Sequence, residues 1–210
     1  MKIQSKRIFA SLTLFSFLAL MPMSCGLFCG NDSCGCGSLP KPRDLRVKSF
    51  ETLTVNESGN EILDSEIKAY NQVFKTLRIK EAEYKVQSSI ESTSSTLGLA
   101  FACDPAPDRT KNSLYLIQIL NQKEFTLADG TNFSVGDNIT SLFGMNHFFA
   151  QGLTSIENFT APGLRLIRED YFKIGVIENP GKELNLKFTI RLLFDDRQEF
   201  LLTDQLLNVR

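Results

Sequence analysis

Residues 184–209 read LNLKFTIRLLFDDRQEFLLTDQLLNV, and this stretch decides the class of the fold. Every second position of its first eleven residues holds a large apolar side chain, and most residues between them are polar. The apolar positions are Leu184, Leu186, Phe188, Ile190, Leu192 and Phe194. A two-residue period is typical of a strand with one buried face, and the acidic DDRQ at 195–198 indicates a turn. We therefore predict a β-hairpin whose inner face buries these six side chains, at about 1.5 to 3 kcal/mol each.

Shorter alternating runs lie upstream and are separated by turn signals. LRVKSFETLTV at 45–55 precedes the turn-rich NESGN, and TLGLAFAC at 96–103 precedes DPAPD, whose prolines are incompatible with a central strand. NSLYLIQILNQKEF at 112–125 is apolar on both faces, which predicts a strand buried between two layers. Together these runs predict an all-β fold, an antiparallel β-sandwich of the immunoglobulin-like or transthyretin-like kind, with one short helix.

Two stretches depart from this pattern. In GDNITSLFGMNHFF at 136–149, Asp137 or Asn138 can cap a helix, so we place the one short helix here. SEIKAYNQVFKTLRIKEAEYKV at 65–86 has apolar residues at helical spacing, but its second half also alternates. Residues 66–80 can thus be read as helix or strand, and we favour a strand from about Gln72.

The first residues have the features of an export signal. Three basic residues are followed by an apolar run from Ile8 to Leu20, which is shorter than the roughly 20 residues of a membrane-spanning helix. The following MPMSC is similar to a bacterial lipobox, whose cysteine receives a thioether-linked diacylglycerol, so we predict lipidation of Cys25. Cys29 is a poorer candidate because the bulky Phe28 precedes it. The alternative is an ordinary secretory signal, with Cys25 in a disulfide.

The sequence thus divides into a signal peptide at 1–24, a Cys- and Gly-rich tether at 25–42 and a folded domain at 43–210. Besides Cys25, four cysteines can form two disulfides in an exported protein, with three possible connectivities. They are Cys29, Cys34, Cys36 and Cys103. Zinc binding is the alternative, but the paired cysteines with two intervening residues that are common in zinc sites do not occur. We expect no metal and no cofactor, and a covalent lipid on Cys25.

The charge balance argues against several partners. Without residues 1–24 the chain keeps 20 basic and 24 acidic residues, with no basic tract that would attract nucleic acid or an anionic lipid surface. Trp is absent and Tyr occurs four times, which makes a glycan-binding surface less expected than a protein-binding one. The expected contacts are the membrane, through the lipid, and an envelope protein.

Catalytic patterns are weak. His147 is the single histidine, and a Ser-His-acid arrangement would use Asp137 or Asp170, but the G-x-S-x-G motif does not occur. We expect His147 to be packed or partly exposed beside aromatic residues. SEIK at 65–68 matches the short S-x-x-K pattern of penicillin-interacting enzymes without its companion motifs.

The acidic pairs and the N-x-S/T motifs each have a simpler interpretation than a functional site. Asp195 and Asp196 could bind calcium, but a solvated turn between two strands is the favoured reading. Glu169 and Asp170 could act as acid and base, but as neighbours on a strand they would point to opposite faces. The N-x-S/T motifs matter only in a eukaryotic cell, which the lipobox argues against. They begin at Asn56, Asn132, Asn138 and Asn158.

The order of features resembles an uncharacterised lipoprotein family of Bacteroidetes-type bacteria. The shared features are the lipobox, the tether, the element ACDP at 102–105 and the final hairpin. The resemblance implies export and membrane anchoring but supplies no activity. Few acidic residues follow Cys25, which favours a periplasm-facing location over the cell surface. We predict a non-enzymatic, protein-binding or accessory lipoprotein of the cell envelope. The alternatives are a structural or assembly accessory of an envelope complex and a small periplasmic hydrolase that uses His147.

Overall fold

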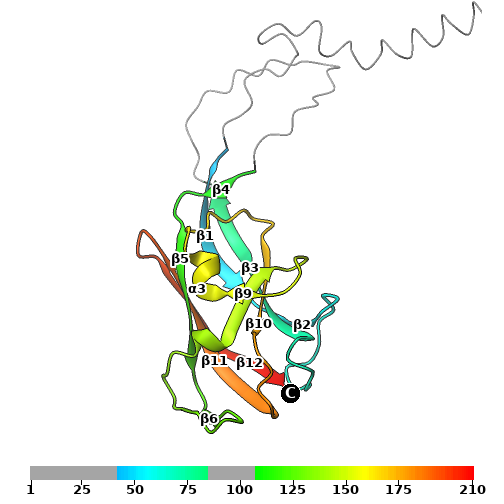
Figure 1. The fold of residues 1–210 in the computed structure, drawn as a ribbon. Coiled ribbons are helices and arrows are strands. Elements are labelled where there is room, and N and C mark those ends of the chain that lie inside the picture. The colour runs from blue at the N-terminus through cyan, green and yellow to red at the C-terminus, as the bar shows by residue number, and fades with distance from the viewer. Residues whose placement is uncertain (1–41, 85–106) are drawn as a thin grey trace, which may run out of the picture. The chain divides into compact units, whose positions relative to one another are not determined.

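The computed structural model describes residues 42–84 and 107–210. The expected signal peptide, nearly all of the expected tether, the five cysteines and the expected strand at 96–103 lie outside the described residues. The described part folds into two main sheets and a small hairpin, with one short α-helix (Figure 1).

The larger sheet has seven strands and the smaller one has three. In spatial order the larger sheet contains β4 (Arg109–Thr110), β1 (Asp44–Glu51), β3 (Val73–Tyr84), β10 (Tyr171–Val176), β8 (Phe143–His147) and β9 (Thr154–Ser155), with β2 (Thr54–Asn56) also paired to β3. The smaller sheet contains β12 (Glu199–Val209), β11 (Leu184–Phe194) and β5 (Leu114–Asn121). A separate hairpin joins β6 (Phe125–Thr126) and β7 (Asn132–Phe133).

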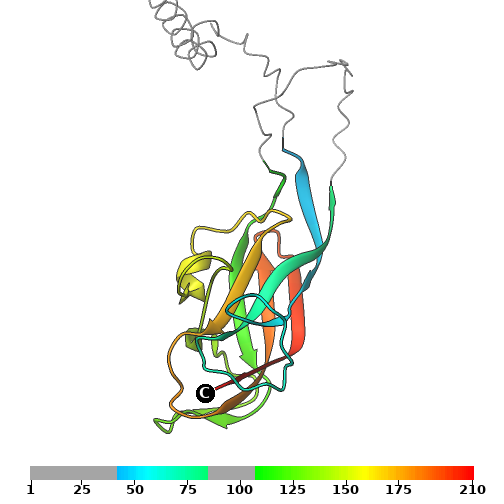
Figure 2. The ribbon, with the colours of Figure 1, turned by 90° about the vertical axis from the view of Figure 1, so that its right-hand side faces the viewer.

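The two sheets form separate layers around one core (Figure 2). Strand pairs are antiparallel throughout, except that β4 runs parallel to β1. Buried side chains from both sheets make up the main hydrophobic cluster, which includes Phe143 of the larger sheet and Phe188 of the smaller one. The predicted all-β, antiparallel sandwich with one short α-helix is confirmed.

The C-terminal hairpin forms as the two-residue period predicts. β11 pairs with β12 from Leu184 opposite Val209 to Leu193 opposite Glu199. All six apolar side chains of the inner face are at most 5% exposed. β5 pairs with the other edge of β11, so this strand forms the centre of the smaller sheet.

The ambiguous stretch at 66–80 is resolved in favour of the strand. β3 begins at Val73, as expected from about Gln72, and continues to Tyr84. One side of β3 pairs with β1 and β2, and the other side pairs with β10. Hydrogen bonding on both edges satisfies the backbone as a strand, and this tertiary pairing outweighs the helical spacing.

The short helix predicted within 136–149 is wrong in place. Asn138 accepts the Thr140 backbone N–H (3.0 Å), but the N-cap of the 3-10 turn η2 (Thr140–Leu142) is Ile139, which makes no side-chain cap bond, and β8 begins directly after this turn. The Ile139 N–H is used by the Ile119 carbonyl at 2.9 Å, which ties the segment to β5. The α-helix of the described residues is α3 (Ile156–Thr160), which Ser155 caps.

β8 forms as a strand partly because Gly144 permits close packing. A Cβ at this position would lie 2.8 Å from the Thr154 carbonyl oxygen and 2.9 Å from the Leu153 side chain. Only a residue without a Cβ therefore lets β9 approach β8 at this distance.

β5 has one covered face rather than two. Ile117 and Ile119 point into the core and are at most 1% exposed, whereas Leu116 and Leu120 on the opposite face are only half-buried. β5 is an edge strand of the smaller sheet. The predicted burial between two layers is therefore wrong for the outer face, which no second layer of the described residues covers.

Candidate functional site

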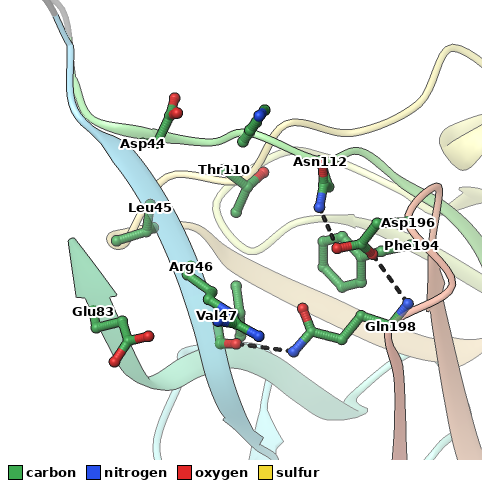
Figure 3. A pocket seen from close by; sticks show the side chains of 11 residues that line it. Asp44, Leu45, Arg46, Val47, Glu83, Thr110, Asn112, Phe194, Asp196 and Gln198 are labelled. Atoms are coloured by element: carbon green, nitrogen blue, oxygen red, sulfur yellow. Dashed lines mark hydrogen bonds between the residues drawn. The ribbon is translucent and has the colours of Figure 1, made fainter. Parts of the chain in front are cut away.

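A cleft of about 410 Å³ lies beside β1 at the point where β4 leaves it (Figure 3). β4 pairs with β1 only at Asp44 and Leu45. Beyond these two residues, the edge of β1 that faces away from β3 is not hydrogen-bonded to another strand of the described residues, although β12 passes nearby, with the Phe50 and Phe200 rings 5.0 Å apart. We call this space the β1 cleft.

The β1 cleft has an apolar floor and a charged rim. Leu45, Val47 and Phe194 line it and are at most 3% exposed, so they form the floor. The charged lining residues are Asp44, Arg46, Glu83, Lys111 and Asp196. An apolar floor with a rim of both charge signs is the composition of many protein-binding surfaces.

Glu83 is held in its ionised form at this rim. The hydrogen bond from Lys48 lowers the pKa of the Glu83 carboxyl, slight desolvation opposes this effect, and the charges of Lys48 and Arg46 add to the lowering. The Lys48 Nζ lies 2.8 Å from the Glu83 carboxylate. The rim therefore keeps its negative charge at neutral pH.

A chain of hydrogen bonds ties the tip of the C-terminal hairpin to β1 (Figure 3). The Asn112 amide donates to the Asp196 carboxylate, which also accepts the Gln198 backbone N–H at 3.0 Å. The Gln198 side-chain amide then donates to the Val47 carbonyl oxygen at 3.2 Å. The Gln198 side chain thus donates to a backbone carbonyl oxygen, that of Val47, which could otherwise accept the N–H of a neighbouring strand.

Sequence reasoning missed the β1 cleft because its walls are far apart in the chain. The Gln198 bond to Val47 joins residues 151 positions apart, and the Asn112 bond to Asp196 joins residues 84 positions apart. No local motif marks such a site, since its defining feature is a strand edge that stays unpaired.

A second cleft, of about 350 Å³, contains a buried lysine. Lys75 is 3% exposed, and its Nζ donates to the Thr54 hydroxyl (2.6 Å) and to the Asp64 carboxylate (3.0 Å). Thr54 also donates to Asp64, so the three polar groups form a closed cluster. In the sequence, Lys75 lies two residues from Val73 and two from Leu77, which face the core. A lysine at such a position indicates a buried charge that needs a partner.

Asp64 is ionised in this cluster. Partial burial raises the pKa of its carboxyl, but the hydrogen bonds from Thr54 and Lys75, together with the Lys75 charge, outweigh burial and lower it. The Asp64 side chain remains 49% exposed, whereas Lys75 is enclosed. The cluster therefore neutralises a buried ammonium group with a carboxylate at the surface.

His147 lies at the exposed end of β8 beside aromatic rings, as predicted. Its ring centroid is 5.0 Å from that of Phe172 and 5.7 Å from that of Phe159. Burial raises the pKa of Asp170, while the Ile167 N–H and the charge of His147 oppose the rise. Within the described residues, no serine or threonine hydroxyl is hydrogen-bonded to the imidazole.

Asp137 belongs to a different turn from His147. Its carboxylate accepts the Ser134 N–H at 2.7 Å. Of the two acids considered for a Ser-His-acid arrangement, Asp170 has its pKa affected by the charge of His147.

The acidic pairs lie in turns. Asp195 and Asp196 are exposed between β11 and β12, which confirms the solvated turn, and Asp195 accepts the Ser113 N–H at 3.1 Å. Glu169 and Asp170 precede β10 rather than lying on a strand, so the prediction that they occupy opposite strand faces is wrong.

The remaining motifs take part in local contacts. Lys68 of SEIK forms an exposed ion pair with Glu66 at 2.9 Å. The Asn56 side-chain oxygen accepts the Ser58 N–H at 3.0 Å, and the Asn138 side-chain oxygen likewise accepts the Thr140 N–H. These two N-x-S/T motifs thus lie in turns that an asparagine side chain stabilises.

The described residues offer neither a metal site nor a membrane-spanning helix. They contain no group of three or more His, Cys, Asp or Glu side chains placed to hold a metal ion. None of their helices has the length and apolar character needed to cross a membrane.

Comparison with known proteins gave no family model and no curated protein that matches this chain. Three similar solved structures are the wild-type C-terminal domain of the AgI/II polypeptide BspA from Streptococcus agalactiae and two chains designated BspA_C_WT and BspA_C_mut. Each is 14% identical with a TM-score of 0.28, and the alignment covers 77% of this chain. It covers 49%, 50% and 46% of those chains, so this chain spans about half their length. A likeness at this level says nothing about function.

Proposed function

We propose that this protein is a lipoprotein of the bacterial cell envelope, anchored through Cys25, whose sandwich domain binds an extended segment of another envelope protein without catalysing a reaction. The observation that carries the binding role is the unpaired edge of β1 above the apolar floor of the β1 cleft. The anchor rests on the export signal and the lipobox-like MPMSC.

An unpaired strand edge presents a row of backbone donors and acceptors. Folded proteins usually cover or blunt such edges, because another chain can pair with them. Among the described residues no strand pairs with this edge beside Arg46 and Val47, and the Val47 carbonyl accepts one side-chain amide rather than a strand N–H. This arrangement suits strand addition, in which main-chain bonds give affinity and pockets for alternate side chains give specificity.

The position of β4 sets the path of the bound segment. β4 already lies along β1 at Asp44 and Leu45, in parallel orientation, and then departs. A segment in the β1 cleft continues along the same edge, beside Arg46 and Val47. Its inward side chain meets the floor, so that side chain is apolar, while its outward neighbours face the charged rim.

Selection of peptides tests the binding role and does not require the partner to be identified first. A library of random linear peptides is selected against the full mature chain, and bound peptides are measured against two variants. Asn112→Arg places a long side chain in the β1 cleft, and Asn132→Arg changes an exposed asparagine of β7 as the matched control. Circular dichroism verifies that both variants fold.

The expected result is selective loss of binding. Asn112→Arg should weaken the selected peptides at least about tenfold, and Asn132→Arg should leave them unchanged. N-methylation of alternate peptide amides should also weaken binding, because main-chain bonds are lost. Peptides that bind both variants equally, or that tolerate N-methylation at every position, would refute strand addition at β1.

The anchor is tested separately. Radiolabelled palmitate should enter the wild-type protein, and a Cys25→Ser variant should lose both the label and its fractionation with the membrane. A wild-type protein without label, with the variant fractionating like wild type, would refute the anchor and leave the peptide-binding result intact.

A further inference from the structure

The outer face of the smaller sheet has an unusual composition for a surface that no described element covers. Five leucines lie on it, and we call it the leucine face. They are Leu116 and Leu120 of β5, Leu193 of β11, and Leu201 and Leu206 of β12. Leu201 is 56% exposed and Leu206 is 37% exposed. The other three leucines are half-buried, and polar residues such as Gln118, Lys187 and Thr189 lie between the leucines, so the face is mixed but more apolar than a fully solvated sheet face.

The strand register brings the leucines into one surface. Leu193 pairs with Leu116 on one side and with Glu199 on the other. Two residues along, Arg191 pairs with Leu201. Farther down β11, Lys187 lies opposite Leu206. Because paired residues point to the same side of a sheet, Lys187, Arg191 and Glu199 each have a leucine as a cross-strand neighbour.

The charged groups among these leucines are paired within the face itself. The Arg191 guanidinium donates to the Glu199 carboxylate at 2.7 Å and to the Gln118 side chain at 3.0 Å. The Lys187 Nζ lies 2.7 Å from the Asp204 carboxylate. A face that neutralises its own charges does not select a strongly charged partner. It suits a partner that is also apolar and internally neutral.

We propose that the leucine face is an interface between two copies of this chain. A second copy supplies the same apolar, internally neutral surface, and a two-fold arrangement places identical patches against each other. Packing sheet against sheet at about 10 Å would turn the three-stranded sheet into the covered layer that the apolar pattern of residues 112–125 predicts. This inference does not depend on the role of the β1 cleft.

The size of the face sets the strength of the contact. β11 has 11 residues, which at about 3.4 Å each gives a length of about 37 Å, and three strands about 4.8 Å apart give a width of about 14 Å. The face thus covers about 500 Å² per copy, and a dimer buries about 1,000 Å² in total. Because this area is at the lower end for specific interfaces, the dimer is weak and depends on protein concentration.

Site-specific photo-crosslinking tests the interface in the full chain. A benzoylphenylalanine at position 201 should capture a second copy, identified by mass spectrometry of a mixture of two differently tagged chains. The same group at Leu63, which is 70% exposed and does not belong to the leucine face, is the matched control and should capture none. Capture of only other proteins at position 201, or equal self-capture at both positions, would overturn the proposal.

Substitution of the same leucine gives an independent readout. Leu201→Lys should weaken self-association, measured by analytical ultracentrifugation of the detergent-solubilised full chain, at least about a hundredfold, because the added ammonium group lies opposite Arg191 and each dimer carries it twice. Leu206→Lys, opposite Lys187, should act in the same direction and serves if Leu201→Lys does not fold. A wild-type chain that stays monomeric at the highest soluble concentration, or variants that associate like wild type, would overturn the proposal.

Discussion

Lys75, Thr54 and Asp64 form the polar cluster of the second cleft. Removing the charge of Asp64 should destabilise the fold more than removing the charge of Lys75. Lys75 is 3% exposed, whereas the Asp64 side chain is 49% exposed. Asp64→Ala leaves an ammonium group enclosed with only the Thr54 hydroxyl as partner. Loss of one partner of a fully buried ion pair costs about 3 to 5 kcal/mol, and the exposure of Asp64 reduces this to about 2 to 3 kcal/mol.

Lys75→Met should cost less, about 1 kcal/mol, because the carboxylate that it leaves behind is solvated and Thr54 still donates to it. The double variant should then be more stable than Asp64→Ala alone, since no buried charge remains. Urea unfolding of wild type, both single variants and the double variant measures these differences. Glu83→Ala, which removes an exposed partner of Lys48, is the control and should destabilise the fold less than Asp64→Ala does.

The same cluster predicts a dependence on pH. The pKa of Asp64 is lowered in the folded protein, so its ionised form stabilises the fold above the ordinary pKa of 3.8. This contribution is lost as the pH falls through the lowered value, where the carboxyl gains a proton. The stability gap between wild type and Asp64→Ala should therefore shrink below about pH 4. Three results would refute this reasoning. They are a Lys75→Met variant as unstable as Asp64→Ala, a double variant whose loss of unfolding free energy equals the sum of the two single losses, and a stability difference between wild type and Asp64→Ala that grows in acid.

Three further substitutions test other parts of the structure. Gly144→Ala should destabilise by about 1 to 3 kcal/mol in urea, because its Cβ would lie 2.8 Å from the Thr154 carbonyl oxygen, and wild-type stability would contradict this packing. Ser49→Ala should raise stability by up to about 1 kcal/mol, since the buried hydroxyl has no hydrogen-bond partner among the described residues, and a loss would indicate a missed partner. Gln198→Ala should tighten binding of cleft-selected peptides by up to about tenfold in a titration, because it frees the Val47 carbonyl, and weaker binding would mean that Gln198 contacts the peptide instead.

The features that can be predicted from sequence are those that depend on near neighbours. The hairpin of β11 and β12 follows from alternation over eleven residues and a turn of four, and both strands and the turn lie within 26 consecutive residues. The strand character of β3 is also visible, although its helical spacing competes until pairing on both edges decides it. Aromatic neighbours of His147 are expected from the NHFF sequence, but the rings that contact it are Phe159 and Phe172, which only the fold brings close.

The features that could not be predicted depend on which edges and faces stay uncovered. Neither predicted residue caps the turn at 140–142, and the hydrogen bond of Ile139 to the distant Ile119 carbonyl and the pairing of β8 with β10 leave room for a single 3-10 turn. The apolar outer face of β5 is visible in the sequence, but the sequence does not show that no other sheet or helix at 42–84 or 107–210 covers it.

By itself the sequence determined that the folded part is an antiparallel sandwich and which side chains of its hairpin face the core, because side-chain alternation is a local property of an extended chain. It also supports the prediction of a lipid anchor at Cys25. Only the tertiary structure decided that β4 leaves β1 after two residues and that Gln198 reaches the Val47 carbonyl. Such pairing is set by the packing of segments far apart in the chain, and no local pattern of residues encodes which strand edge will remain open.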